Sequence, residues 1–250
     1  MSKVRLKVAT PCATCRVTNT RLQAGIASQF TLEASLNRIS VIILAIIGTT
    51  IAAVTPAEAQ ICFGLGKFRI EQSDDRFSAD GLTTVSGKNN RISKKSVNGG
   101  THIGCDGMFV EPVAIKRQAD GSIVGLSFYV HNDAFDDTAF GSTSIGTLRR
   151  IAFVTGEGQP ISLPITDGGT RWGRITYNSA SRSASSQVFE TGIAELTPEQ
   201  FRRIINATLL AVRIEGNGRT VTYEARDISK SFIPNLRTFY AAHLTQGAGQ

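Results

Sequence analysis

The stretch that decides the fold is residues 209–226, LLAVRIEGNGRTVTYEAR, near the carboxyl end of the 250-residue chain. Asn217-Gly218 is a residue pair favoured by two-residue hairpin turns in which both central positions have positive φ. A turn centred there places apolar residues opposite one another, as in Ile214 with Val221, Val212 with Tyr223 and Leu210 with Ala225. The alternate positions are polar, so this register predicts a half-buried antiparallel hairpin.

A second hairpin is predicted around Asp120-Gly121 by the same reasoning. Its register pairs apolar residues on one face, which are Ile115 with Leu126 and Val113 with Phe128, followed by Val130. Further strands are expected at 67–71, 148–155, 160–165, 172–178 and 187–194, separated by breaks rich in Gly, Pro and Ser. Many short strands at this spacing favour an antiparallel sandwich or barrel over parallel βαβ units.

Two helices are predicted late in the chain. Thr197 is the expected N-cap of the first, with Pro198 as its first helical residue and Gln200 completing a capping box. Leu196 and Phe201 have the spacing of a hydrophobic staple. The second helix is expected at about 231–244, where apolar residues recur at helical spacing. The predicted fold is mainly β, an antiparallel β-sandwich or barrel-like sheet with two C-terminal α-helices.

Two polar segments are predicted to be loops. Residues 86–100, SGKNNRISKKSVNGG, contain four basic side chains and little that can be buried. Residues 179–186, SASRSASS, are expected to form a flexible polar loop. A basic loop can bind an anionic surface, but a solvated loop is the simpler interpretation of 86–100.

Composition excludes several classes of protein. Apolar residues make up 41% of the chain, and the mean hydropathy is −0.02, which excludes a disordered chain, a collagen-like repeat and a polytopic membrane protein. Of the net charge of +7, residues 1–59 contribute +4 and residues 60–250 contribute +3. The second region is too weakly basic to predict nucleic-acid binding.

Residues 36–59 have the organisation of a secretory signal peptide. The uncharged run 39–54, ISVIILAIIGTTIAAV, follows Arg38 and precedes an A-x-A motif that ends at Ala59. Cleavage after Ala59 leaves Gln60 as the mature amino terminus. An uncleaved signal anchor is the alternative, although 16 apolar residues are short for a membrane-spanning helix.

The residues before this signal are too many for an ordinary n-region. Translation from Leu36 gives a compact signal, so 1–35 is interpreted as an untranslated or disordered extension. Its Cys12 and Cys15 then have no function, whereas a redox or metal role for them requires a folded context. Residues 60–250 are expected to form one exported β-rich domain in the periplasm or outside the cell.

Two cysteines, Cys62 and Cys105, remain in that domain. In an oxidising compartment an even number of cysteines predicts a disulfide. A metal site that combines Cys62 with His102 and Cys105 is the alternative, but no fourth ligand stands at a suitable spacing. We expect the disulfide, and no cofactor.

The densest polar cluster is residues 131–137, HNDAFDD. His131 with Asp133, Asp136 or Asp137 has the chemistry of a general base with an orienting acid, and the carboxylates have that of a Ca²⁺ site. The spacing does not match an EF-hand loop. We therefore expect an acidic connecting loop with His131 exposed at a strand end, where its substitution costs less than about 1 kcal/mol.

Arg171, Trp172, Arg174 and Tyr177 fall near one predicted strand. Surfaces of aromatic residues and Arg bind glycans and protein partners. The interior of a sandwich usually contains a lone Trp, so core packing of Trp172 is the simpler expectation.

The functional expectation is a non-catalytic, exported binding or envelope-associated protein. Its partner is expected to be a protein or another envelope component, with membrane contact only through an uncleaved signal segment. The alternative is an envelope or extracellular hydrolase that uses His131 and a neighbouring Asp. A hydrolase requires His131 in a concave site beside a carboxylate, whereas a binding module requires an exposed apolar or aromatic patch.

Overall fold

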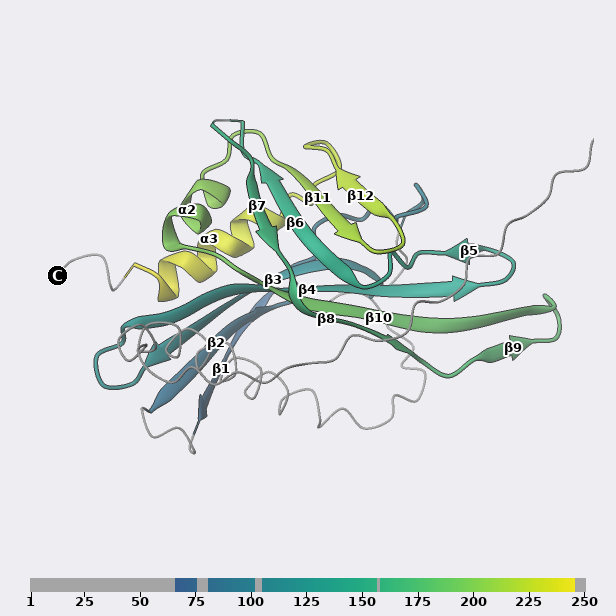
Figure 1. The fold of residues 1–250 in the computed structure, drawn as a ribbon, viewed down its shortest axis with the longest axis horizontal. Coiled ribbons are helices and arrows are strands. Elements are labelled where there is room, and N and C mark those ends of the chain that lie inside the picture. Colours follow the sequence, from purple (N-terminus) through teal and green to yellow (C-terminus); the bar gives the residue numbers. More distant parts are fainter. Residues whose placement is uncertain (1–65, 76–80, 102–104, 157, 246–250) are drawn as a thin grey trace, which may run out of the picture. The chain divides into compact units, whose positions relative to one another are not determined.

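The computed structural model describes residues 66–75, 81–101, 105–156 and 158–245 (Figure 1). Two antiparallel sheets and two helices form from these residues. The larger sheet contains β1 (Arg69–Asp75), β2 (Leu82–Lys88), β3 (Gly107–Arg117), β4 (Ile123–Asp137), β5 (Gly141–Ser142), β8 (Thr166–Trp172), β9 (Thr176–Asn178) and β10 (Ser183–Glu195). The smaller sheet contains β6 (Leu148–Val154), β7 (Ile161–Pro164), β11 (Ala211–Gly216) and β12 (Thr220–Tyr223). The helices are α2 (Pro198–Ile205) and α3 (Phe232–His243).

The larger sheet has the strand order β1-β2-β3-β4-β10-β8, and the smaller sheet the order β12-β11-β6-β7. Short strands extend the larger sheet at one end, where β5 pairs with β4 and β9 pairs with β10. The chain passes from the smaller sheet to the larger at Ile165, the single residue between β7 and β8. The Ile165 amide donates to the Arg149 carbonyl at 2.8 Å, which holds the crossing point against β6. The predicted β-rich α+β fold is confirmed.

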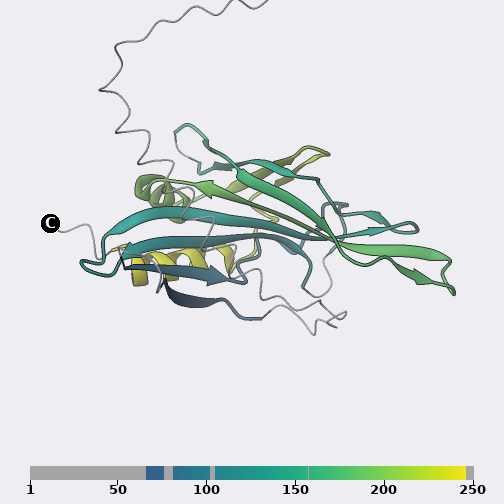
Figure 2. The same ribbon diagram turned by 60° about the horizontal axis from the view of Figure 1, so that its bottom comes forward.

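One apolar core joins the two sheets and the helices. Figure 1 shows the smaller sheet and both helices on the same side of β4 and β10, and Figure 2 shows α3 lying along β2 and β3. The largest side chains of the core are fully buried, and they come from every layer: Phe128, Phe153, Phe201, Phe232 and Phe239. In β3 and β4 the core contains only even-numbered residues, as the alternation of a strand requires.

The hairpin predicted within 209–226 forms with the expected register. Val212 pairs with Tyr223 and Ile214 with Val221, and these four side chains belong to the core. The turn geometry differs from the prediction, because neither Asn217 nor Gly218 has a positive φ. The turn is docked on the segment of the same chain that contains Ile145. The Gly218 and Arg219 amides donate to the Ile145 carbonyl at 3.0 and 3.2 Å. These hydrogen bonds override the local preference for a free two-residue turn.

The second hairpin forms from the predicted strands, but the predicted register is wrong. Leu126 pairs with Ala114 and Phe128 with Pro112, one residue away from the predicted partners. The loop is longer than two residues, since the Arg117 amide donates to the Ser122 carbonyl at 2.9 Å, and a bulge follows at Ile115/Lys116. Val113 and Ile115 therefore lie on the face away from the core, yet both are buried. Period-2 patterning could not set this register, because β3 is buried on both faces.

Both predicted helices are confirmed. In α2 the Thr197 hydroxyl accepts from the Gln200 amide, and the Gln200 side chain accepts from the Thr197 amide, which completes the capping box. Leu196 and Phe201 are both buried in the core. In α3, Pro234 lies in the first turn, as expected from its missing amide hydrogen.

Three local predictions are wrong. Residues 86–100 are not a solvated loop, since β2 extends to Lys88 and Ile92 is fully buried in the core. The expected strand 172–178 is interrupted, because β8 ends at Trp172 and β9 begins at Thr176. Residues 183–186 belong to β10 and not to a flexible loop. Pairing with distant strands and one buried isoleucine outweigh the polar composition of these segments.

Several predictions fall outside the described residues. These are the extension 1–35 with Cys12 and Cys15, the signal 36–59, Cys62 and His102. The disulfide between Cys62 and Cys105 therefore stays a prediction. In the described part of the chain, neither helix is long and apolar enough to cross a membrane.

Candidate functional site

His131 lies in the middle of β4 and not at a strand end. The strand continues through Asp137, so the predicted acidic connecting loop does not exist. His131 pairs with Phe109 of β3 on one side and with Thr191 of β10 on the other. Its ring stacks on the Phe109 ring with centroids 4.6 Å apart and planes 3° apart. Only 15% of its side chain is exposed, so the prediction of an exposed His131 is wrong.

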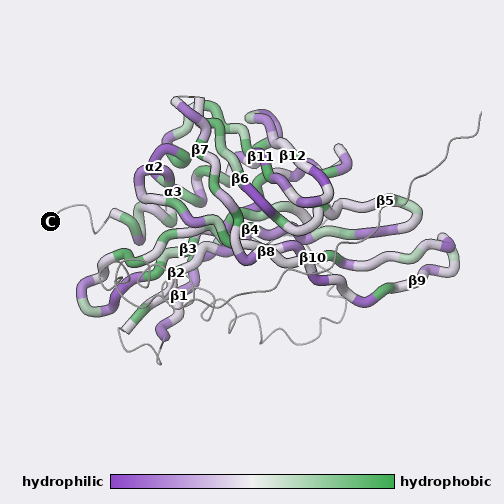
Figure 3. The backbone as a smooth tube through the Cα atoms, in the orientation of Figure 1, coloured by the Kyte–Doolittle hydropathy of each residue, from purple (hydrophilic) through white to green (hydrophobic). Residues whose placement is uncertain are grey.

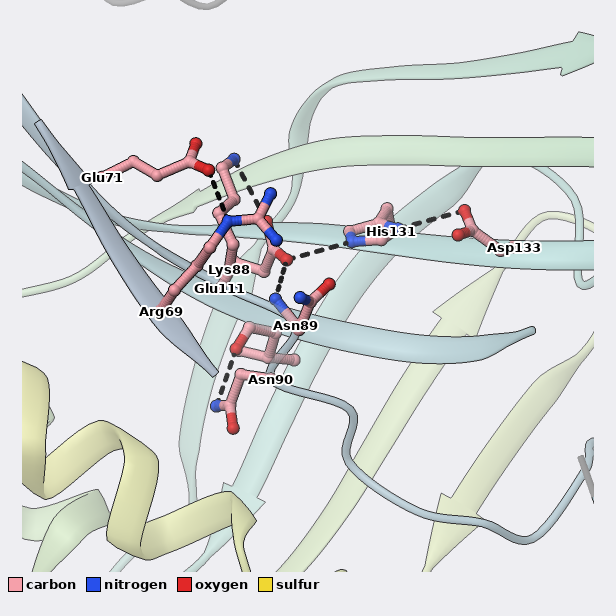
Figure 4. A network of polar contacts seen from close by, with 9 residues as sticks. Arg69, Glu71, Lys88, Asn89, Asn90, Glu111, His131 and Asp133 are labelled. Carbon is pink, nitrogen blue, oxygen red and sulfur yellow. Dashed lines mark hydrogen bonds and ion pairs between the residues drawn. The ribbon is translucent and has the colours of Figure 1, made fainter. Parts of the chain in front are cut away.

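Two carboxylates flank the His131 ring (Figure 4). Nδ1 lies 3.1 Å from Asp133 Oδ1, and Nε2 lies 3.6 Å from Glu111 Oε1. Glu111 also accepts from the Asn89 amide at 2.8 Å and from Lys88 Nζ at 3.2 Å. The result is a continuous network of charges on the face of the larger sheet that points away from the core.

The network favours the charged form of His131. Burial alone would lower the pKa of His131, but hydrogen bonds and attraction from Asp133 and Glu111 raise it to about 9. Burial would likewise raise the pKa of Glu111, but His131 and Lys88 hold it below its ordinary value. At neutral pH His131 is therefore an imidazolium between two carboxylates.

The sequence cluster 131–137 comes together only in part. Asp133 contacts His131, as the hydrolase alternative requires. Asp136 lies on the opposite face of β4, and Asp137 is six residues along the strand, about 20 Å from His131. The Asp137 carboxylate instead accepts from the Ala139 and Phe140 amides at 2.7 and 3.1 Å, which fixes the turn before β5.

Two buried carboxylates were not predicted from the sequence. Glu111 belongs to the His131 network, and Glu190 is fully buried on the core face of β10. Glu190 accepts from the Asn132 side chain at 2.7 Å, from the Ile145 amide at 3.1 Å, from the Gly146 amide and from the Ser144 hydroxyl. For Glu111 the signal is an acidic residue within the apolar run 108–115, since a buried carboxylate needs a partner. Glu190 has no such signal, because β10 is rich in polar residues.

Asp106, just before β3, is a third carboxylate near this network. Burial and the charge of Asp133 raise its pKa to about 6, against the opposing effect of Arg91. In the ranges that the structure describes, no three His, Cys, Asp or Glu side chains are placed to hold a metal ion. A cavity of about 350 Å³ lies elsewhere, at the carboxyl end of α2, where Arg202, Asn206 and Thr208 are among its lining residues.

Large apolar side chains are exposed at one end of the larger sheet. We define the hairpin tip as residues 137–141, between β4 and β5, together with 171–184, from the end of β8 to the start of β10. Its apolar side chains are 56–81% exposed, and they are Phe140, Trp172, Ile175 and Tyr177. The expectation that Trp172 packs in the core is therefore wrong.

Strand pairing holds the two parts of the hairpin tip together. Asp137 pairs with Ser185, and the Thr138 amide donates to the Ala184 carbonyl at 3.0 Å. Ala184 pairs in turn with Tyr177 of β9. Both hairpins extend in the same direction in Figures 1 and 2. In Figure 3 a hydrophobic stretch lies just before β9, within an otherwise polar segment.

The chain turns outward between β8 and β9 and so exposes Ile175. Gly173 still donates its amide to the Gln187 carbonyl at 2.7 Å, and its carbonyl accepts from the Ser186 hydroxyl at 3.1 Å. Pairing with β10 resumes only at Thr176. Arg174 and Ile175, between these two points, are exposed. The backbone is thus fixed on both sides of an exposed apolar side chain.

Comparison of the chain with protein-family models, with curated proteins and with solved structures gives no match.

Proposed function

We propose that this chain is a non-catalytic binding protein of the cell envelope or extracellular space, and that the hairpin tip contacts its partner. The observation that carries the proposal is the exposure of Phe140, Trp172, Ile175 and Tyr177 at one end of the sheet. Outside the tip, the exposed large apolar side chains in the described residues are Val154 and Leu209, and most of the buried ones form a core shared by both sheets and both helices. Exposed clusters of this kind are typical of interaction sites, and Trp and Tyr contribute strongly to binding energy.

The hydrolase alternative receives less support from the His131 geometry. A carboxylate does lie within hydrogen-bond reach, as that alternative requires. A general base must however accept a proton, and the pKa of about 9 keeps His131 protonated at neutral pH. Its Nδ1 and Nε2 both face carboxylates, and one ring face stacks on Phe109. The network thus resembles a structural ion-pair cluster more than a poised base.

Envelope location rests on the signal-like residues 36–59, and binding at the tip is tested separately. The full chain with Trp172→Ala and Tyr177→Ala is compared with a matched control, Val154→Ala and Leu209→Ala, which removes exposed apolar side chains outside the tip. Retention on an immobilised envelope fraction should fall at least about tenfold for the tip variant only. Equal retention of both variants would contradict the proposal.

A further inference from the structure

The hairpin tip combines exposed apolar side chains with positive charge. Between Gly168 and Phe189 the chain contains three arginines, Arg171, Arg174 and Arg182, and no acidic residue. All three arginines are exposed. Arg171 lies over the Phe189 ring, with its guanidinium carbon 5.0 Å from the ring centroid. Two aromatic rings and three guanidinium groups are therefore presented by one stretch of 14 residues.

Acidic groups near the tip offset this charge only in part. Asp137 is the one carboxylate within the tip, and its Oδ1 is occupied by the Ala139 and Phe140 amides. Asp136 precedes it on β4 and pairs with Ser142 and Ser186. Three arginines against one aspartate give the tip a formal charge of +2, so the surface is complementary to an anionic partner.

The kinds of apolar side chain distinguish between possible anionic partners. A sugar ring stacks on flat aromatic faces, so Ile175, which is 73% exposed, would not contribute to a glycan site. Phe140 and Ile175, the two most exposed, favour hydrocarbon. Trp and Tyr favour the boundary between hydrocarbon and water, and arginine binds phosphate. Together these preferences match the headgroup region of a phospholipid bilayer.

We propose that the partner of the hairpin tip is an anionic phospholipid surface, an inference that rests on the proposed function. Phe140 and Ile175 enter the boundary between headgroups and acyl chains, Trp172 and Tyr177 lie at the level of the headgroups, and Arg174 and Arg182 pair with phosphates. This contact does not involve residues 39–54, since it uses only residues 137–141 and 171–184. It also explains why the exposed apolar residues lie on protruding hairpins, which can enter a bilayer surface without unfolding.

The sole tryptophan makes the proposal directly testable, because all tryptophan emission comes from Trp172. The full chain is titrated with vesicles of phosphatidylcholine alone or of phosphatidylcholine and phosphatidylglycerol in equal parts. We expect a blue shift of the emission, and quenching by nitroxide-labelled acyl chains, with the anionic vesicles. No blue shift, or an equal shift with zwitterionic vesicles, would overturn the lipid assignment.

Charge variants provide the matched comparison. Arg174→Ala with Arg182→Ala should weaken the affinity for anionic vesicles, measured by Trp172 emission, about 25-fold. Each basic residue near an anionic surface contributes about fivefold to that affinity. The control, Arg226→Ala with Lys230→Ala, removes two exposed charges outside the tip and should leave the response unchanged. Equal responses of the two variants would overturn the proposal. If the chain does not bind the anionic vesicles while its retention on the envelope fraction still depends on the tip, the lipid assignment is wrong and the binding function stands.

Discussion

At the residue scale, His131 shows how neighbours decide the role of a titratable group. The sequence shows a histidine among acidic residues and predicts an exposed strand end. In the structure the ring is stacked on Phe109 and lies between Glu111 and Asp133, and only Asp133 is near it in the sequence. Its substitution should therefore cost more than the 1 kcal/mol expected of a surface residue, because two carboxylates would lose their partner.

His131 should make the stability of the domain depend on pH. Its pKa of about 9 in the folded state exceeds the ordinary value near 6.5. Its stabilising contribution is therefore complete below pH 6.5 and is lost as the pH rises through 9. We expect this group to lower the free energy of unfolding by up to about 3 kcal/mol across that range, as measured by urea denaturation.

Two variants isolate this effect. His131→Phe keeps a ring against Phe109 but cannot titrate, so the stability loss between pH 6.5 and 9 should shrink. His243→Gln is the control, because burial and the charge of Lys116 lower the pKa of His243 and its titration falls below this range. An unchanged slope in His131→Phe would show that the imidazolium does not stabilise the fold.

At the element scale, the turn of the β11–β12 hairpin is held by its neighbours more than by its own sequence. Residues 144–147 lie between this turn and Glu190 of β10. The Ile145 and Gly146 amides donate to the Glu190 carboxylate, and the Ile145 carbonyl accepts from the turn. A buried acid in the larger sheet thus fixes the segment on which the smaller sheet is docked.

This close approach predicts a specific steric cost. A Cβ at Gly216 would lie 2.1 Å from the Ile145 carbonyl oxygen, and a backbone atom cannot move aside. Gly216→Ala should lower the free energy of unfolding by about 1–3 kcal/mol, as overpacked sites do. Gly100→Ala is the matched control, because nothing lies within 4 Å of its Cβ position. Similar urea midpoints for the two variants would contradict the docked turn.

At the scale of the whole molecule, the described domain leaves one end of its larger sheet without a covering layer. The smaller sheet and the helices cover β3, β4 and β10 near their middle, whereas the hairpin tip extends beyond them (Figure 1). The exposed aromatic residues follow from a difference in length between the strands of the two sheets. β4 and β10 contain 15 and 13 residues, but the strands of the smaller sheet contain four to seven.

The predicted disulfide is tested on the exported protein, whose amino terminus we expect at Gln60. Alkylation under denaturing, non-reducing conditions should label no cysteine, because Cys62 and Cys105 are then the only two thiols and both are oxidised. Reduction should lower the free energy of unfolding by about 3–4 kcal/mol, the loop-closure value for a loop of about 43 residues. Two labelled cysteines per chain before reduction would favour the metal alternative.

The sequence by itself determined the parts of the fold that depend on local chemistry. Capping residues fixed the start of α2, and the alternation of apolar and polar side chains fixed the register of β11 with β12. These signals act within a few residues, so they can be interpreted from the local sequence without knowledge of distant partners. The overall class, β-rich with two late helices, follows from many such signals together.

Only the tertiary structure decided the rest. The register of β3 with β4 depends on a loop and a bulge, and a strand buried on both faces gives no alternation from which to read it. The burial of Ile92, the exposure of Trp172 and the pairing of His131 with Glu111 each depend on which layer covers a given residue. Burial and charge pairing between segments far apart in the sequence arise only when the chain is folded. They determine where the His131 network and the hairpin tip lie.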